Sequence, residues 1–292
     1  MGGTEPSIAY GIGCARRLLQ KLGDTPSADM GFADLTIGAE CGGSDYTSGL
    51  AGNRLVGYFF DQLQDMGGTA LFEEIVEAAG LKKQLTARAA NETARAQLAA
   101  AYGKAFAYCR SVRQYSISPG NFAGGLSSIE EKSMGAIVKS GTKPIQGVLK
   151  VGQPPAGKGL WLLDSTPDPY WMQFGYTNPN DNEGLMDLIA CGCQMVFLVT
   201  GRGNVVGSAV APVFKITGNH GTFQRMRGDI DFDAGPLLSG ESTLPGLGNT
   251  LFQAVAAVCH GEPTRAEELG HKEFFISYKY QDGWRAEKKR CH

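Results

Sequence analysis

Residues 33–50 read ADLTIGAECGGSDYTSGL, and this stretch decides the fold class. Residues 33–39 form a short apolar run of the strand type, and residues 41–45 interrupt it with two glycines and polar side chains. A helical pattern of apolar residues then continues from Leu50 to Leu63. A strand, a glycine loop and a helix in this order are typical of one unit of a parallel α/β sheet.

The same alternation continues on both sides of this stretch. A helical pattern covers residues 8–22, and a strand over residues 69–75 is followed by an alanine-rich helical region over 76–109 with a break near Gly80. Further strand-like runs lie at residues 145–151, 160–163, 195–200 and 205–217, with a helical stretch at 183–190. We therefore predict a single α/β domain over residues 1–292, with a mainly parallel sheet flanked by helices in Rossmann-like layers.

The composition excludes several classes of protein. Of the 292 residues, 42% are hydrophobic and 19% are charged, and the net charge is −2. The chain should therefore fold, and it has no overall basic field to hold a nucleic-acid backbone. Its longest apolar run is far shorter than the roughly 20 residues that span a bilayer, and no signal-peptide pattern opens it. We expect a cytoplasmic protein that binds neither nucleic acid nor membranes.

Three motif lookalikes do not predict a cofactor site. Residues 152–159 (GQPPAGKG) approach a phosphate-binding P-loop, but Gly159 replaces the Ser or Thr that holds magnesium, and a strand-like run follows instead of a helix. Residues 201–207 (GRGNVVG) follow a strand but miss the dinucleotide fingerprint. Cys191 and Cys193 are closer than the usual zinc spacing, so we expect reduced core thiols there and for most of the seven cysteines.

Two glycine loops that follow predicted strands are suited to bind an anion. Ligands of parallel sheets bind beyond the carboxyl ends of the strands, where backbone N–H groups and a guanidinium can hold a carboxylate or phosphate. The candidate groups in these loops are Gly43, Ser44, Asp45, Gly201, Arg202 and Gly203. A helix cap for the first loop and a tight turn for the second remain open as structural alternatives.

The most polar glycine-dense loop covers residues 116–125 and contains Ser118 and Asn121. It is followed by Ser128 and Glu131, whose spacing predicts a capping box at the start of a helix that ends at Gly141. Glu131 would then stabilise the helix end. Lys132 would lie in the first helical turn, where a cation opposes the helix dipole unless an anion neutralises it, so Lys132 is a candidate functional residue.

A second group of candidates lies near the C-terminal end. Asp229, Asp231 and Asp233 alternate with apolar residues, so an extended segment would put their carboxylates on one face, as a divalent metal site requires. A solvated strand face is the alternative. His220, which follows Asn219, is the histidine that we place nearest to a site.

Together these motifs resemble one known family in their order and spacing, over about residues 19–273. The stretches that carry the resemblance are ECGGSD at 40–45, SPGN at 118–121, EKS at 131–133 and TGRG at 200–203. Later matches are Pro212, Lys215, Asn219 and residues 231–235. The sequence is similar to the altronate and galactarate dehydratases.

The resemblance implies a hydro-lyase that removes water from a sugar acid and gives a 2-keto-3-deoxy acid. It also implies a divalent metal, with Fe²⁺ expected first and Mg²⁺ or Mn²⁺ as alternatives. On this reading Arg202 and the amides of Gly201 and Gly203 hold a carboxylate, and Lys132 or Lys215 is the base or the enolate stabiliser. Further substrate contacts are Gly43, Ser44, Asp45, Ser118, Asn121 and Asn219, and the candidates for a metal or a substrate hydroxyl are Asp45, Asp231 and Glu131.

The resemblance leaves two alternatives for the activity. A branch of the family acts as a sulfolactate sulfo-lyase. Family enzymes also resemble a three-part chain in which a small β-rich domain and another α/β segment precede the matched region. We therefore expect N-terminal domains or a partner subunit, with a homodimer as a further assembly. Without those parts the chain would be a non-catalytic half-site that binds sugar acids.

Overall fold

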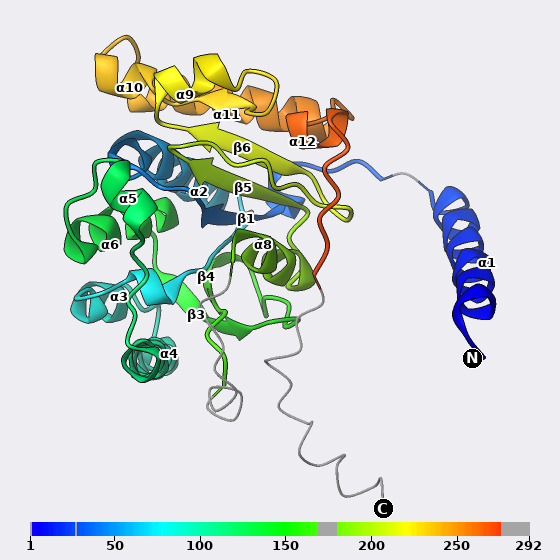
Figure 1. Cartoon of the computed structure of the whole chain (residues 1–292), viewed down its shortest axis with the longest axis horizontal. Coiled ribbons are helices and arrows are strands. Elements are labelled where there is room, and N and C mark those ends of the chain that lie inside the picture. Colours follow the sequence, from blue (N-terminus) through cyan, green and yellow to red (C-terminus); the bar gives the residue numbers. More distant parts are fainter. Residues whose placement is uncertain (1, 27, 169–179, 276–292) are drawn as a thin grey trace, which may run out of the picture. The chain divides into compact units, whose positions relative to one another are not determined.

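The computed structural model describes residues 2–26, 28–168 and 180–275 (Figure 1). The chain divides into two compact units, residues 1–31 and residues 32–292. In the first unit, helix α1 (Thr4–Gly23) corresponds to the helix predicted over residues 8–22, and none of its residues is buried. The second unit contains the sheet and the candidate site.

The strands of the second unit form one sheet, which has seven strands within the described residues, all of them parallel. Their order across the sheet is β3-β4-β2-β1-β5-β6-β7 (Figure 1). The bounds are β1 (Thr36–Cys41), β2 (Thr69–Phe72), β3 (Ile145–Lys150), β4 (Gly159–Asp164), β5 (Met195–Thr200), β6 (Val213–Thr217) and β7 (Phe232–Asp233). This confirms the predicted α/β class with a parallel sheet.

The strand order creates a switch point beside β1. The chain leaves β1 toward β2 on one side, whereas β5 pairs with β1 on the other side. The loops after β1 and β5 therefore lie side by side at the carboxyl edge, where the N–H groups of Gly201 and Arg202 both donate to the carbonyl oxygen of Gly43, at 3.3 and 3.0 Å. Such switch points are where ligand sites of open α/β sheets form.

Helices cover both faces of the sheet (Figure 1). On one face, α2 (Asn53–Asp65) and α11 (Leu244–Cys259) pack through Phe59 and Phe252, whose rings stack at 4.0 Å, and Phe59 also meets Phe197 of β5. α8 (Asp181–Ala190) packs on the opposite face, where its leucines join the inner residues of β5 in a second apolar cluster. Burial of these two layers positions the edge on which the polar loops lie.

The remaining described helices are shorter or lie near the ends of the sheet. They are η1 (Phe32–Asp34), η2 (Ser48–Gly52), η3 (Ile75–Glu77), α3 (Lys82–Ala87), α4 (Glu92–Val112), α5 (Pro119–Ala123), α6 (Ile129–Ile137), η4 (Val138–Ser140), α9 (His220–Arg225), α10 (Pro236–Ser239) and α12 (Arg265–Glu268). The helical region predicted over residues 76–109 is indeed broken near Gly80, which has φ +77°.

Two predicted boundaries are wrong. Only residues 213–217 of the run 205–217 form a strand, because the Asn204 and Ser208 side chains accept hydrogen bonds from the N–H groups of Val206 and Val210 and hold turns. The segment 116–125 is not all loop, since Ser118 and Asn121 form a capping box that starts the short helix α5. The expected extended run of alternating aspartates is also short, because β7 contains only residues 232 and 233.

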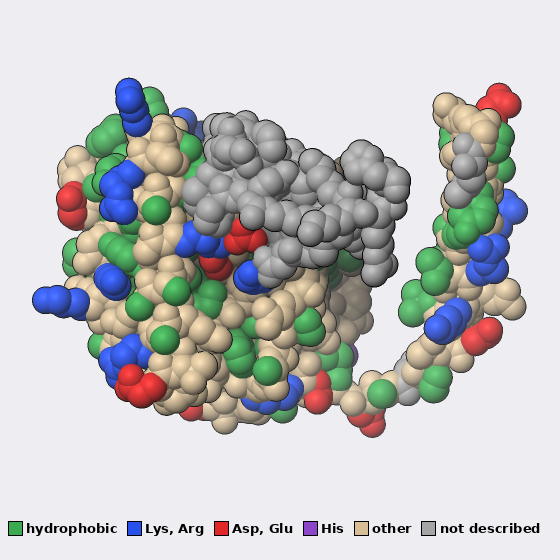
Figure 2. All heavy atoms as spheres, turned by 90° about the horizontal axis from the view of Figure 1, so that it is seen from below, with side chains coloured by type: hydrophobic (Ala, Val, Ile, Leu, Met, Phe, Trp, Pro, Cys, Tyr) green, Lys and Arg blue, Asp and Glu red, His purple; other side chains and the backbone are tan. Residues whose placement is uncertain are grey.

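Several predicted exclusions agree with the described residues. Gly159 begins strand β4, so no helix follows the P-loop lookalike, and both Cys191 and Cys193 are buried free thiols. On the face drawn in Figure 2, Lys and Arg side chains are spread among other residues and form no basic field. Among the described residues, no helix combines the length and the apolar character that are needed to span a membrane.

Candidate functional site

A polar cavity of about 200 Å³ lies at the carboxyl edge of the sheet, beside the switch point. It is enclosed by the loop after β1, the loop after β5, helix α5 and the first turn of α6. The cavity brings together six of the predicted site residues, namely Gly43, Ser44, Ser118, Asn121, Lys132 and Arg202. Cys41, Glu74, Glu77 and Asp181 line it as well.

Lys132 forms a nearly buried ion pair at the cavity wall. Its Nζ lies 2.5 Å from Glu77 Oε1 and donates to the carbonyl oxygen of Ser116 at 2.7 Å. Burial opposes ionisation of both groups, yet Glu77 raises the pKa of Lys132, while Lys132 and Lys139 lower the pKa of Glu77. Both groups are therefore charged, and Glu77 is the anion that neutralises a lysine in the first turn of α6.

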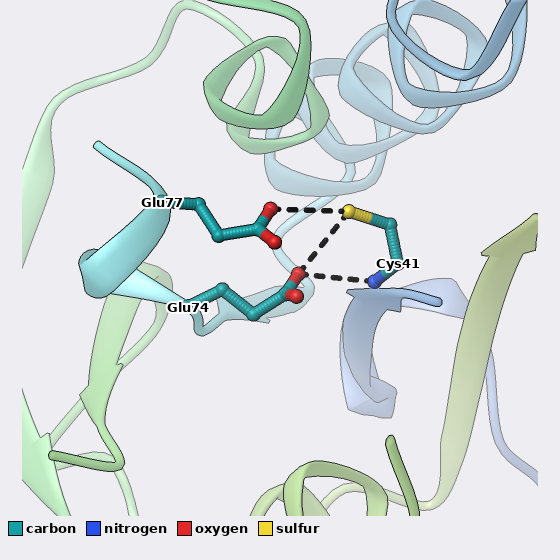
Figure 3. A group of neighbouring side chains, drawn as sticks. All are labelled: Cys41, Glu74 and Glu77. Carbon is teal, nitrogen blue, oxygen red and sulfur yellow. Dashed lines mark hydrogen bonds between the residues drawn. The ribbon is translucent and has the colours of Figure 1, made fainter. Parts of the chain in front are cut away.

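Cys41 lies between two carboxylates (Figure 3). Its Sγ lies 3.2 Å from Glu74 Oε2 and 3.6 Å from Glu77 Oε2, and its backbone N–H also donates to Glu74 Oε2 at 3.1 Å. The fully buried Lys139 reaches the same point, since its Nζ donates to Glu74 and lies 3.4 Å from Cys41 Sγ. Burial, reinforced by Glu74, raises the pKa of the Cys41 thiol well above its usual value, so the sulfur stays protonated.

The register of the sheet explains why these residues meet. Ala39 of β1 pairs with Phe72 of β2 in the last register pair, so the next residues bring Glu40 level with Glu73 and Cys41 level with Glu74. Glu74 has φ 71°, a left-handed conformation that is uncommon for a residue with a side chain. Burial, with a contribution from Glu77, raises the pKa of Glu74 to about 7.

A second group of carboxylates lies directly beside the first. Oxygens of Glu40, Glu73 and Glu74 lie within 4.8 Å of one another, and Glu40 and Glu73 are each only 2% exposed. Ser165 Oγ donates to Glu73 Oε2 at 2.5 Å, whereas Glu40 Oε2 is buried without a hydrogen-bond partner. Burial and the neighbouring carboxylates raise the pKa of Glu40 and of Glu73 well above the usual range.

Arg202 is exposed at the border between the polar cavity and an adjoining open cleft. Its guanidinium packs over helix α5, where a Cβ at Gly120 would lie 2.1 Å from Nη1. None of the hydrogen bonds or ion pairs within the described residues uses the Arg202 side chain. A planar cation that is held in place but has no anion is suited to bind a ligand carboxylate.

Asp45 and Asn219 meet in the adjoining cleft although 174 positions separate them, with Asn219 Nδ2 donating to Asp45 Oδ2 at 2.9 Å. Asp45 Oδ1 accepts hydrogen bonds from the backbone N–H and hydroxyl of Thr47 at 2.8 and 2.6 Å. Gly201 has no room for a Cβ against the Asp45 carboxylate. The structure therefore places Asp45, Gly201 and Asn219 at the site, where Asp45 holds the loops together.

Three other predicted residues have structural partners. Ser118 and Asn121 cap α5, and Asn121 Nδ2 also donates to the Ser44 carbonyl oxygen at 3.0 Å, which ties α5 to the loop after β1. The Glu131 side chain accepts from the N–H and hydroxyl of Ser127, so it stabilises the start of α6 one residue before the predicted partner. Its neighbour Lys132 reaches the cavity.

Lys215 and Asp231 lie apart from the polar cavity. Lys215 is buried in the middle of β6, and its N–H donates to Asp231 Oδ2 at 2.7 Å, while Asp231 Oδ1 accepts from the N–H of Arg265. Both groups of three potential metal ligands within the described residues exclude Asp45 and Asp231. Gly203 stays in the loop after β5 with φ +104°, and its N–H donates to Thr200 Oγ1.

The carboxylates of the site are missing from the sequence predictions. Glu73 and Glu74 interrupt an apolar run that was predicted as one strand over residues 69–75, and Glu40 ends the run before the first glycine loop. Acidic residues at the carboxyl end of a buried parallel strand are a usable signal, because that end faces the ligand. Lys139 gives no such signal, since it lies in an ordinary helical pattern.

Comparison with known proteins gives the family. The family model described as D-galactarate/Altronate dehydratase, C-terminal, matches residues 32–282. The chain belongs to this family. The matched range begins where the second compact unit begins, so the sheet and the polar cavity both lie within the dehydratase C-terminal domain.

The relatives in this dehydratase family are lyases, as the sequence predicts. The chain is 34% identical to the altronate dehydratase of Bacillus subtilis over 258 residues, which is 85% of this chain and 48% of the relative. It is 33% identical to the galactarate dehydratase (L-threo-forming) of Escherichia coli over 251 residues, 85% of this chain and 46% of the relative. The chain thus spans about half the length of these dehydratases.

A third relative is covered more completely. The chain is 32% identical to the (2R)-sulfolactate sulfo-lyase subunit beta of Chromohalobacter salexigens over 285 residues, which is 96% of this chain and 70% of that subunit. The family therefore includes a lyase whose name identifies it as one subunit of a larger enzyme.

Proposed function

We propose that the chain forms the active-site half of a hydro-lyase that removes water from a sugar acid of the altronate or galactarate type and gives a 2-keto-3-deoxy acid. Family membership supports a lyase. The observation that carries the proposal is the polar cavity itself, because Arg202 and the ion pair of Lys132 and Glu77 line one small space. An anchor for a carboxylate then lies beside groups that can move protons.

The roles follow from the charges. Arg202 binds the substrate carboxylate, and Glu77 takes the proton from the adjacent carbon, whose electron pair forms the double bond of the enediolate. The Lys132 ammonium stabilises that negative charge and gives a proton to the leaving hydroxyl, which departs as water. The 2.5 Å contact then lets Glu77 return its proton to Lys132, and the enol product tautomerises to the 2-keto acid. Lys215 has no part in this scheme because it does not line the cavity.

A divalent metal is part of the proposal. A bound cation would supply positive charge for the enediolate. Two groups of side chains have suitable donors: Cys41 with Glu74 and Glu77, and Glu40 with Glu73 and Glu74. The thiol of the first group suits softer metals such as iron, and the oxygens of the second suit Mg²⁺ or Mn²⁺. The buried, unpartnered Oε2 of Glu40 shows that the second group has an open ligand position.

The test is a direct assay of sugar acids. The chain is supplied with aldonates and aldarates in the presence of Mg²⁺, Mn²⁺ or anaerobic Fe²⁺, alone and together with the unmatched part of a dehydratase relative as a separate chain. We expect a 2-keto acid, and we expect Lys132→Met to lower its rate of formation at least about 100-fold. Lys143→Met, which removes a surface ion pair with Asp65, is the matched control and should leave the rate unchanged. Binding of sugar acids without product in every combination would contradict the proposal.

The second candidate function is sulfo-lyase activity. It is favoured by the sulfo-lyase subunit, of which the chain covers 70% against about half of each dehydratase. The same cavity would then hold a short hydroxy acid that carries a sulfonate, and a C–S bond would break in place of the C–O bond. Release of sulfite from sulfolactate, without a keto acid from sugar acids, decides for this reaction. In either case we propose that upstream domains or a partner subunit complete the enzyme.

A further inference from the structure

We propose that Glu40, Glu73 and Glu74 bind one divalent cation of the Mg²⁺ or Mn²⁺ class through their carboxylate oxygens. The proposal deepens the proposed lyase function, on which it rests for its catalytic meaning, since it names the position and the class of the cation. It is argued from geometry and charge, and cation binding can be measured on the resting protein without any substrate.

The backbone supplies the donor set. Glu40 ends a central strand and Glu73 follows its neighbour one residue beyond the last register pair, so both project to the same face of the sheet as α8. Glu74 adds a third carboxylate, and the three groups offer oxygens within 4.8 Å of one another. Oxygen donors from carboxylates are the ligands that Mg²⁺ and Mn²⁺ prefer.

The charges around this group do not balance within the described residues. Five carboxylates, those of Glu40, Glu73, Glu74, Glu77 and Asp181, influence one another here, while the ammonium groups of Lys132 and Lys139 are the cations among them. Lys132 pairs with Glu77 and Lys139 with Glu74, so neither is bonded to Glu40 or Glu73. Buried negative charge without a counter-charge is costly, and a divalent cation would supply it.

An open ligand position distinguishes this group from the one around Cys41. Glu40 Oε2 is completely buried and has no hydrogen-bond partner, although Glu40 as a whole is only 2% exposed. At Cys41, by contrast, the ammonium of Lys139 already contacts both the sulfur and Glu74 Oε2. The hydrogen bonds of the Glu74 side chain to described residues use Oε2, which leaves Oε1 for the cation.

The surroundings hold these carboxylates in place. Helix α8 passes so close that a Cβ at Gly184 would lie 2.7 Å from Glu40 Oε1, so the carboxylate cannot turn away in that direction. The hydroxyl of Ser165 fixes Glu73 from the other side at 2.5 Å. Hydrogen bonds to ligand carboxylates of this kind orient them toward a metal.

The experiment is a Mn²⁺ titration of the full chain, followed by electron paramagnetic resonance of free Mn²⁺ and by competition with Mg²⁺. We expect one Mn²⁺ per chain, displaced by Mg²⁺, and an upward shift of the unfolding midpoint when the cation is present. Glu40→Gln and Glu73→Gln should each weaken binding roughly tenfold or more. Glu92→Gln, which changes a carboxylate with 85% side-chain exposure, is the matched control and should bind as the wild type does.

Two comparisons make the result decisive. The unfolding midpoint of each variant without metal shows that it folds, and two independent variants guard against a defect in one. Absence of Mn²⁺ binding, or binding that both Gln variants retain, overturns the proposal. Loss of binding in Cys41→Ser together with normal binding in Glu40→Gln would move the cation to the Cys41 group and overturn it as well. Because no turnover is measured, failure here leaves the test of the lyase function unaffected.

Discussion

Arg202 is the residue whose replacement tests substrate recognition most cleanly. Its side chain is exposed and bonds to none of the described residues, so Arg202→Leu should leave the unfolding midpoint unchanged. A charge-assisted bond to the carboxylate would be lost, so kcat/KM should fall about 100-fold, mainly through KM. Steady-state kinetics and thermal unfolding check both parts. Arg95→Leu, on the surface of α4, is the control, and normal kinetics in Arg202→Leu would remove Arg202 from the site.

Lys215 gives the opposite expectation, because its buried Nζ has no hydrogen-bond partner and burial lowers its pKa. Lys215→Met replaces a buried charge by an apolar chain of similar length and should raise the free energy of unfolding by about 1 to 3 kcal/mol. The wild type should gain stability as pH rises from the lowered pKa toward the usual lysine value, since the unfolded chain then binds more protons. The variant should lack that gain in denaturant titrations at several pH values. Loss of turnover in the folded variant would restore Lys215 as a catalytic candidate.

At the scale of elements, helix α5 positions the guanidinium of Arg202. A methyl group at Gly120 would meet Nη1 at 2.1 Å, and because this is the end of a flexible side chain, Gly120→Ala should displace the guanidinium without unfolding α5. We expect KM to rise about tenfold with little change in the unfolding midpoint.

Gly103→Ala is the matched control for this change. Gly103 lies inside α4 with open space around it, so the substitution should stabilise the fold by about 0.5 to 1 kcal/mol and leave KM unchanged. Equal kinetics for the two variants would show that α5 does not position Arg202.

The strands could be predicted where an apolar run was continuous and ended in glycine. β5 lies at residues 195–200 as expected, because MVFLVT is apolar and β-branched and Gly201 follows it. Helix α11 is missing from the predictions although Thr243 caps it and Pro245 lies in its first turn, since two further glycines interrupt the pattern. Local signals decide such boundaries only when they agree.

The site could be predicted only in part, for a physical reason. Gly43 and Arg202 stand out because their loops follow apolar strands. Glu40 and Glu73 become neighbours only through the pairing of β1 with β2, and one sequence does not contain the register of two strands 30 residues apart. The distance between Asp45 and Asn219 depends likewise on the order of strands across the sheet.

For the whole molecule, the division at residue 31 gives a further prediction. None of the residues of α1 is buried, and the family model begins at residue 32. A chain that lacks residues 1–31 should therefore unfold with a midpoint within about 2 °C of the full chain. Calorimetry of both chains checks this. A large fall, or loss of cooperative unfolding, would show that the first unit supports the fold of the second.

The two hydrogen bonds that Gly43 accepts from Gly201 and Arg202 have a consequence for how this fold can change. The loops after β1 and β5 share one hydrogen-bond pattern, so an added residue in either would misalign the other. The turn over residues 152–158 has open space around Gly152 and Gly157 and carries no such obligation. In a library of single-residue insertions, length variation should therefore accumulate at that turn and be purged from both loops.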